Sequence, residues 1–118
     1  MRIRFIPATD THELRRLVLR NGDPSAVVIW PGDENVDSFH LGAFLGDHCI
    51  GVASFQPEGN GQLNGKRPFR LRGMATLLQH QGTGVGTGLL RSAIDPLRGL
   101  EADVLWCNAR EVALRFYE

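Results

Sequence analysis

The amino-acid sequence predicts a single α/β domain, residues 1–118, built on a mixed β-sheet. Three observations lead to this class. A strand-like segment at 69–76 runs into a glycine-rich turn and then into an apolar pattern of helical period. Two alternating segments within 39–56 flank a tight turn, as in a β-hairpin. A short apolar run at 104–107 is typical of a buried parallel strand.

The first third of the chain predicts one strand, one helix and one long loop. Residues 3–6 alternate between apolar and polar side chains and form the first strand. A helix capped by Asp10 or Thr11 follows, and it ends at 20–22 because Asn and Gly favour the left-handed conformation. Residues 23–38 contain prolines, glycine and acids, and they are expected to form a loop.

The middle of the chain predicts three consecutive strands. The hairpin pairs 39–45 with 48–56 across the turn at 46–47. A polar, glycine-rich loop at 57–68 leads to the third strand, at 70–76.

The last third predicts a helix, a strand and a final helix. The first of these helices starts at Gly84 and should end at Pro96, because proline supplies no donor and disfavours helical geometry at the residue before it. The strand at 104–107 follows, and the pattern at 109–117 indicates a helix.

The composition excludes several classes of protein. The 13 Lys and Arg balance the 13 Asp and Glu, so nothing indicates a nucleic-acid partner or an anionic membrane surface. No apolar run approaches the length of a membrane span. Cys49 and Cys107 form neither a disulfide framework nor a spaced metal pair, so we expect no metal and a reduced, cytoplasmic setting.

The glycine-rich turn is the most informative local feature. Gly82, Gly84, Gly86 and Gly88 alternate with other residues at the start of the apolar helix. Residues without a Cβ let backbone N–H groups approach an anion, which the helix dipole also favours. The turn lacks the Lys-Ser/Thr of a P-loop and the G-x-G-x-x-G of a dinucleotide site. Its pattern is Gln-x-x-Gly-x-Gly, which begins at Gln81.

This pattern resembles the acetyl-CoA pyrophosphate loop of the GNAT N-acetyltransferase superfamily. Residues 71–76 resemble the central strand of that family, and 108–117 resemble its later Asn…Phe-Tyr segment; 39–44 and 50–55 match more loosely. The resemblance implies a GNAT-like fold, an α+β mixed sheet. It also implies an acetyl-CoA-dependent N-acetyltransferase that transfers the acetyl group directly to a small-molecule or terminal amine.

The resemblance also implies which residues bind acetyl-CoA. The glycine loop would hold the pyrophosphate, while the strand backbone would pair with the pantetheine arm and place one N–H near the thioester oxygen. Asn108 would bond the pantetheine or simply cap the following helix. The implied set is Met74, Thr76, Gln81, Gly82, Thr83, Gly84, Val85, Gly86, Thr87 and Asn108. Gly73, before this set, suits either a β-bulge or tight packing.

Tyr117 is the implied catalytic residue and the one tyrosine of the chain. Its phenol would protonate the departing thiolate, although its ring could instead pack in the core. A general base is not evident, since Arg70 and Arg72 stand where many relatives place a carboxylate. The remaining candidates for a base are Glu58, His40 and His80.

The chain ends at Glu118, before the last one or two strands of the family. We therefore expect an exposed apolar sheet edge that a homodimer would cover. The alternative function is a non-catalytic acyl-CoA-binding module or an inactive truncated acetyltransferase. A nucleotide-binding protein of another class is disfavoured by the spacings above. The acids of the loop at 23–38 would attract a cationic amine or are simply solvated.

Overall fold

The protein folds around one six-stranded sheet in the order β1-β2-β3-β4-β5-β6. The structure, a computed structural model, describes residues 1–59, 65–107 and 113–115. Adjacent strands are antiparallel except β4 and β5, which are parallel. The strands are β1 (Arg2–Ile6), β2 (Phe39–Leu45), β3 (His48–Pro57), β4 (Pro68–Thr76), β5 (Val104–Trp106) and β6 (Ala113–Arg115). The mixed α/β sheet predicted from the sequence is thereby confirmed.

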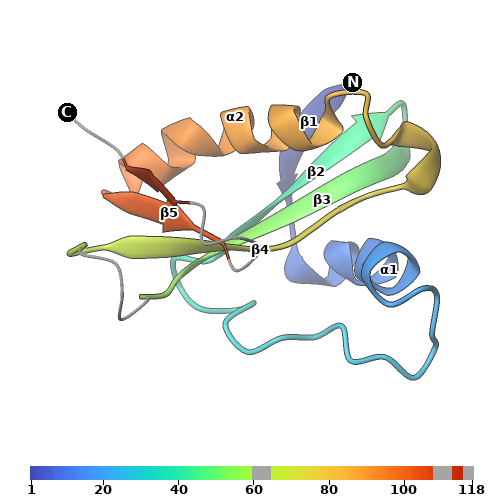
Figure 1. Ribbon diagram of the computed structural model, residues 1–118, viewed down its shortest axis with the longest axis horizontal. Helices are drawn as coiled ribbons and strands as arrows, with labels where there is room; N and C mark the ends of the chain where they lie inside the picture. Colours follow the sequence, from blue (N-terminus) through green and yellow to red (C-terminus); the bar gives the residue numbers. More distant parts are fainter. Residues whose placement is uncertain (60–64, 108–112, 116–118) are drawn as a thin grey trace.

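Helices cover both faces of the sheet. α2 crosses one face, and the first helical segment and the following loop lie against the other (Figure 1). The helical elements are η1 (Ala8–Thr11), α1 (His12–Leu14), η2 (Arg15–Leu19), η3 (Leu78–His80) and α2 (Val85–Gly99). The predicted first strand, hairpin, loop at 23–38, central strand and parallel strand are all confirmed.

The first helical segment starts earlier than predicted but ends where predicted. It begins at Ala8, and no side-chain cap bonds its N-terminus. The Thr11 hydroxyl instead donates back to the Ala8 carbonyl at 2.6 Å, so the predicted capping role is wrong. The segment ends at Leu19 with Arg20 as its C-cap, and Asn21 and Gly22 follow with left-handed φ angles of 53° and 77°.

Pro96 does not end α2, contrary to the prediction. The helix continues to Gly99, and the Pro96 carbonyl accepts a bond from the Leu100 N–H at 3.0 Å. Leu97, one residue beyond the proline, is fully buried. Burying a leucine contributes about 1.5–3 kcal/mol, which is comparable with the cost of about 3 kcal/mol for an interior proline.

The predicted helix at 109–117 is wrong for the part that the structure describes. Ala113–Arg115 form β6, which pairs antiparallel with β5. A parallel strand at the edge of a sheet leaves a row of unpaired backbone groups, and pairing satisfies them at the expense of local helix propensity. Residues 108–112 and 116–118 lie outside the described residues.

The packing of α2 sets the position of the glycine loop. Leu89, Ala93 and Leu97 are fully buried against the sheet. Gly51 on β3 allows the first turn of α2 to come close, since a Cβ there would lie 2.6 Å from Val85 Cγ1. The start of α2 is thus held over the β3–β4 end of the sheet.

A buried ion pair holds the loop at 23–38 against the opposite face. Arg15, with no exposed surface, donates from Nη1 and Nη2 to the Asp33 carboxylate at 2.8 and 2.9 Å. It also donates to the Val28 carbonyl and to Ser54 Oγ, each at 2.8 Å. His40 bonds Ser54 Oγ at 2.7 Å through Nδ1, which extends the network along β2 and β3.

The surroundings of Asp33 favour its charged form. Burial alone raises the pKa of this carboxyl. The hydrogen bonds from Arg15 and from the Trp30 N–H outweigh burial, so the pKa lies below its usual value. The ionised carboxylate therefore stabilises the folded protein.

We predict that Asp33→Asn lowers the free energy of unfolding at pH 7 by about 3–5 kcal/mol, because the Arg15 charge stays buried without its partner. The pKa of Asp33 is lower in the folded state, so its contribution is present above the unfolded pKa of about 3.9 and is lost as the pH falls through the folded value. Urea denaturation from pH 7 downward should therefore show that the difference in free energy of unfolding between wild type and variant becomes smaller below about pH 4.

The matched control for this prediction is Asp95→Asn, an exposed aspartate on α2. It should change stability by no more than about 0.5 kcal/mol at any pH. The role assigned to the Arg15–Asp33 pair would be contradicted if Asp33→Asn lost little unfolding free energy at pH 7. It would also be contradicted if the loss stayed the same in acid.

Candidate active site

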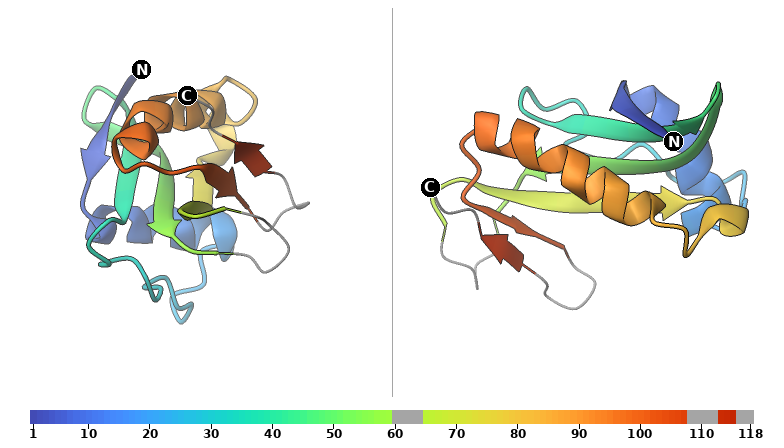
Figure 2. Two further views of the ribbon diagram at one scale, coloured as in Figure 1. Left: turned by 90° about the vertical axis from the view of Figure 1, so that its left-hand side faces the viewer. Right: turned by 90° about the horizontal axis from the view of Figure 1, so that it is seen from above.

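The site forms where β4 and β5 separate. β5 pairs with β4 only from Pro68 to Arg70, while β4 continues to Thr76. Seen from above, the two parallel strands diverge beneath α2 (Figure 2, right). The edge of β4 from Leu71 onward is therefore not paired with β5 and is open to an extended ligand.

A β-bulge shapes β4 at this point. The register passes from Ser54↔Arg72 to Val52↔Ala75, so two residues of β4 oppose a single residue of β3. One of the two is Gly73, with a φ of 71°. A Cβ on Gly73 would also lie 2.3 Å from the Trp30 ring. The predicted bulge is confirmed, and tight packing accompanies it.

Two cavities adjoin the separated strands. One, of about 240 Å³, lies on the α2 side and is largely apolar, with Leu90 and Ile94 in its wall. The other, of about 560 Å³, includes Trp30 in its wall and lies on the opposite side of the sheet. Leu71 and Cys107 line both, so the cavities meet at the gap between β4 and β5.

The glycine loop has open space above its backbone. Gly82 and Gly84 have φ angles of 77° and 91°, and a Cβ on either would meet nothing within 4 Å. Gly84 is the N-cap of α2 and gives no side-chain cap. The first N–H groups of any helix lack intrahelical partners, and the helix dipole adds partial positive charge there. The loop therefore fits an anion.

Hydrogen bonds inside the protein fix the shape of this loop. The Gln81 side chain donates to the Thr76 carbonyl at 3.0 Å, which ties the loop to the end of β4. The Thr83 hydroxyl donates to the His80 carbonyl at 2.5 Å. These two side chains support the loop and leave the backbone between them open.

The structure brings the predicted β4 residues and loop residues together. A Cβ on Gly86 would lie 3.2 Å from Met74 Sδ, so Gly86 allows packing on β4. Val85 is buried and faces the core, which leaves its backbone as the part available to a ligand. Thr87 lines the cavity on the α2 side. Asn108 and Tyr117, the remaining predicted site residues, lie outside the described residues.

The candidate bases do not meet at the cavities. His40 is buried and bonds Ser54 and the Asp33 carbonyl. Glu58 forms an ion pair with Arg70 at 2.9 Å. Among the described residues that line the two cavities there is no aspartate, glutamate or histidine.

Sequence reasoning missed two residues that line the larger cavity, Arg20 and Trp30. Both come from outside the central strand, and no motif surrounds them. The acids of the loop at 23–38 are not part of this wall. Asp33 pairs with Arg15, and Asp37 lies 2.5 Å from Arg67.

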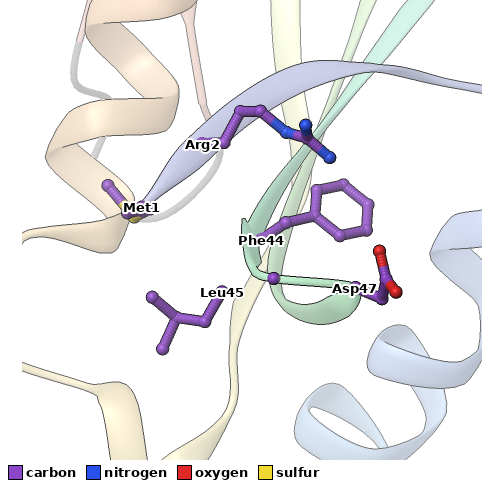
Figure 3. Close-up of a pocket in the computed structure, with 6 residues that line it drawn as sticks. Met1, Arg2, Phe44, Leu45 and Asp47 are labelled. Carbon is purple, nitrogen blue, oxygen red and sulfur yellow. The ribbon is translucent and has the colours of Figure 1, made fainter.

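A further hollow of about 360 Å³ lies away from the strand separation, beside the β2–β3 turn (Figure 3). Its wall includes Arg2, Phe44 and Asp47. It contains none of the predicted site residues.

A strand that separates from its neighbour beside a glycine-rich turn at the start of a helix is the arrangement that the resemblance to the GNAT superfamily predicts. The acetyltransferase (GNAT) family model matches residues 8–118. The chain is 32% identical over 117 residues to the uncharacterized N-acetyltransferase YitI of Bacillus subtilis (strain 168), covering 99% of this chain and 78% of that protein. The chain therefore belongs to the acetyltransferase (GNAT) family, and its class is that of the N-acetyltransferases.

Solved structures agree on the fold. A GNAT family acetyltransferase from Brucella melitensis in complex with acetyl-CoA superposes with a TM-score of 0.68 at 21% identity, covering 99% of this chain and 88% of the other. An IAA acetyltransferase from Bacillus cereus ATCC 14579 gives 0.66 at 24% identity. That match covers 90% of this chain, which spans 63% of the Bacillus cereus protein. At these identities the likeness shows the fold alone.

No helix among the described residues is long and apolar enough to span a membrane. Nor do the described residues contain a group of three or more His, Cys, Asp or Glu side chains that could hold a metal ion.

Proposed function

We propose that this protein transfers the acetyl group of acetyl-CoA directly to the amine of a small molecule or to a terminal amine. One observation carries the proposal: the open glycine loop lies at the end of a strand that separates from its neighbour. An anion site and an open strand edge in this order suit a ligand with a pyrophosphate and an extended amide-containing arm.

Each part of acetyl-CoA has a matching part of the protein. The pyrophosphate would accept bonds from the backbone N–H groups between Gly82 and Thr87. The pantetheine arm would lie along β4 between Met74 and Thr76, like an added strand, with Asn108 as a further partner. The Met74 N–H would then donate to the thioester oxygen and polarise the carbonyl.

The chemical step needs no covalent enzyme intermediate. The neutral amine nitrogen attacks the thioester carbonyl carbon, so that a C–N bond forms as the C–S bond breaks. The nitrogen loses one proton, and the departing thiolate gains one. We assign the second transfer to the Tyr117 phenol, whose pKa lies close enough to that of a thiol for easy exchange.

We predict that Gly82→Ala weakens acetyl-CoA binding about tenfold or more, because a methyl group would occupy the space above the loop. Calorimetric titration with acetyl-CoA, alongside CoA and ATP, measures this directly. Wild-type protein should bind acetyl-CoA and CoA in preference to ATP.

Gly22→Ala is the matched control for backbone strain. Gly22 has the same φ of 77° and the same empty surroundings, but it lies in the turn after η2. Both variants should lose a similar amount of stability, about 1 kcal/mol. Equal acetyl-CoA affinity in the two variants would refute the loop as the phosphate site, and no CoA binding by folded wild type would refute the proposed function.

We predict that Tyr117→Phe lowers kcat by about 100-fold or more while leaving the affinity for acetyl-CoA unchanged. Loss of a general acid slows the protonation of the leaving group without touching the phosphate contacts. Steady-state rates of CoA release, together with calorimetry, separate the two effects. Full turnover in the variant would dismiss the role.

A second candidate function is a module that binds acyl-CoA without turning it over. The observation in its favour is the absence of a carboxylate or imidazole from the described walls of both cavities. Tight acetyl-CoA binding with no acetylated product from any amine would favour this candidate over transfer.

We propose a homodimer and a cytoplasmic location as further attributes. β6 is the last strand in the sheet order, and the outer backbone groups of an edge strand can pair with a second copy. Cys49 and Cys107 are both free thiols, which accords with a reducing compartment. Light scattering at micromolar concentration is expected to give twice the monomer mass; a folded monomer at high concentration would end the dimer proposal.

A further inference from the structure

The cavity that faces away from α2 has a strongly cationic wall. Its described lining contains the arginines Arg20, Arg70 and Arg72, with no acidic residue among them. The chain as a whole has no net charge, so this concentration of like charge is local. Like charges held close together repel one another, and a nearby opposite charge is needed to offset that repulsion.

The three arginines differ in their ion pairing within the part of the chain that the structure describes. Arg70 is ion-paired with Glu58 at 2.9 Å. Within the described residues, Arg20 and Arg72 form no ion pair. The Arg72 guanidinium instead stacks on the Trp30 ring, with its Cζ 4.8 Å from the ring centroid.

The surroundings of Arg72 penalise its charge. Burial lowers the pKa of this guanidinium and the neighbouring Arg70 charge lowers it further, and together they outweigh the opposite effect of the Glu58 and Asp33 carboxylates. An anion in the cavity would offset both effects. The guanidinium forks of arginine suit carboxylate and phosphate oxygens, which they can bind in pairs.

These arginines do not serve the acetyl-CoA phosphates. The glycine loop lies at the start of α2, and α2 lines the cavity on its own side of the sheet. The arginine cavity is lined by Leu19 of η2, by Arg20 and Trp30, and by the stretch of β4 from Arg70 to Met74. Among the described lining residues, the two cavities share only Leu71 and Cys107. A molecule in the arginine cavity would thus meet the thioester through the gap between β4 and β5.

We propose that the acceptor is a small amine that carries an anionic group, a carboxylate or a phosphate, which Arg72 and Arg20 bind while the amine points toward the gap. This inference rests on the proposed function. Aminoglycosides and polyamines are disfavoured acceptors, because their charge is positive throughout and the arginines of the cavity would repel it. The acids of the loop at 23–38, one expected attraction for a cationic amine, are not in the described lining.

The test measures acetyl transfer from acetyl-CoA by the full chain to matched pairs of amines. Each of the common amino acids is compared with its carboxamide, and phosphoethanolamine is compared with ethanolamine; spermidine represents the cationic class. The expected result is a kcat/KM about tenfold or more higher for the anionic member of at least one pair. The pair that responds tells a carboxylate from a phosphate.

Variants locate the effect. Arg72→Gln and Arg20→Gln should each raise KM for the anionic acceptor about tenfold and leave the affinity for acetyl-CoA unchanged. Arg72→Lys should recover part of the loss, since it keeps the charge without the fork. Arg2→Gln, an exposed arginine beside the hollow of Figure 3, is the control and should change neither value. Because Arg20 is exposed, its variant remains informative if Arg72→Gln fails to fold.

The outcomes separate the two proposals. The acceptor inference alone would be overturned if transfer to neutral or cationic amines were at least as efficient as transfer to anionic ones. An unchanged KM in both arginine variants would also overturn it. If no amine reacts, N-acetylated amino acids and inorganic phosphate are titrated into CoA-loaded protein, and no binding would likewise overturn it. Failure of wild type to bind acetyl-CoA would overturn the proposed function, and this inference with it.

Discussion

The buried guanidinium of Arg15 is the constraint on which much of the molecule depends. It joins η2, the loop at 23–38 and β3 through bonds to Val28, Asp33 and Ser54. Taking such a charge out of water costs several kcal/mol, which only a well-formed set of partners offsets. The loop is therefore held in one position, although it contains neither helix nor strand.

The position of that loop determines the shape of the site. Trp30 lies on the Arg15 guanidinium, with Cζ 3.8 Å from the ring centroid, and its ring meets β4 at Gly73. Any side chain at Gly73 would collide with that ring, and the left-handed backbone there forms the bulge. The buried ion pair, the aromatic ring and the bulge are thus one unit, and the wall of the arginine cavity is part of it.

Much of the fold was predictable because the relevant signals are local. A hairpin needs only alternation around a tight turn, and a phosphate loop needs glycines at the start of a helix; both patterns lie within a few residues of sequence. Gly73 belongs here too, since a bulge was one of the two roles expected from a glycine at this position. Pro96 and β6 were missed because tertiary contacts decide them. Burial of Leu97 extends the helix, and pairing with β5 makes 113–115 a strand.

The candidate site likewise has one half that local sequence signals predict and one half that tertiary contacts determine. The proposed acetyl-CoA half is built from backbone groups, whose requirements appear in the sequence as glycines at fixed spacing. The proposed acceptor half is assembled from side chains far apart in the chain, among them Arg20, Trp30 and Arg72, and no local pattern connects them. Their combined effect is electrostatic. A cationic wall attracts an anionic group and also disfavours the ammonium form of an amine bound beside it. A site of this kind can therefore hold an acceptor and favour its nucleophilic form with arginines alone, which lessens the need for a carboxylate base.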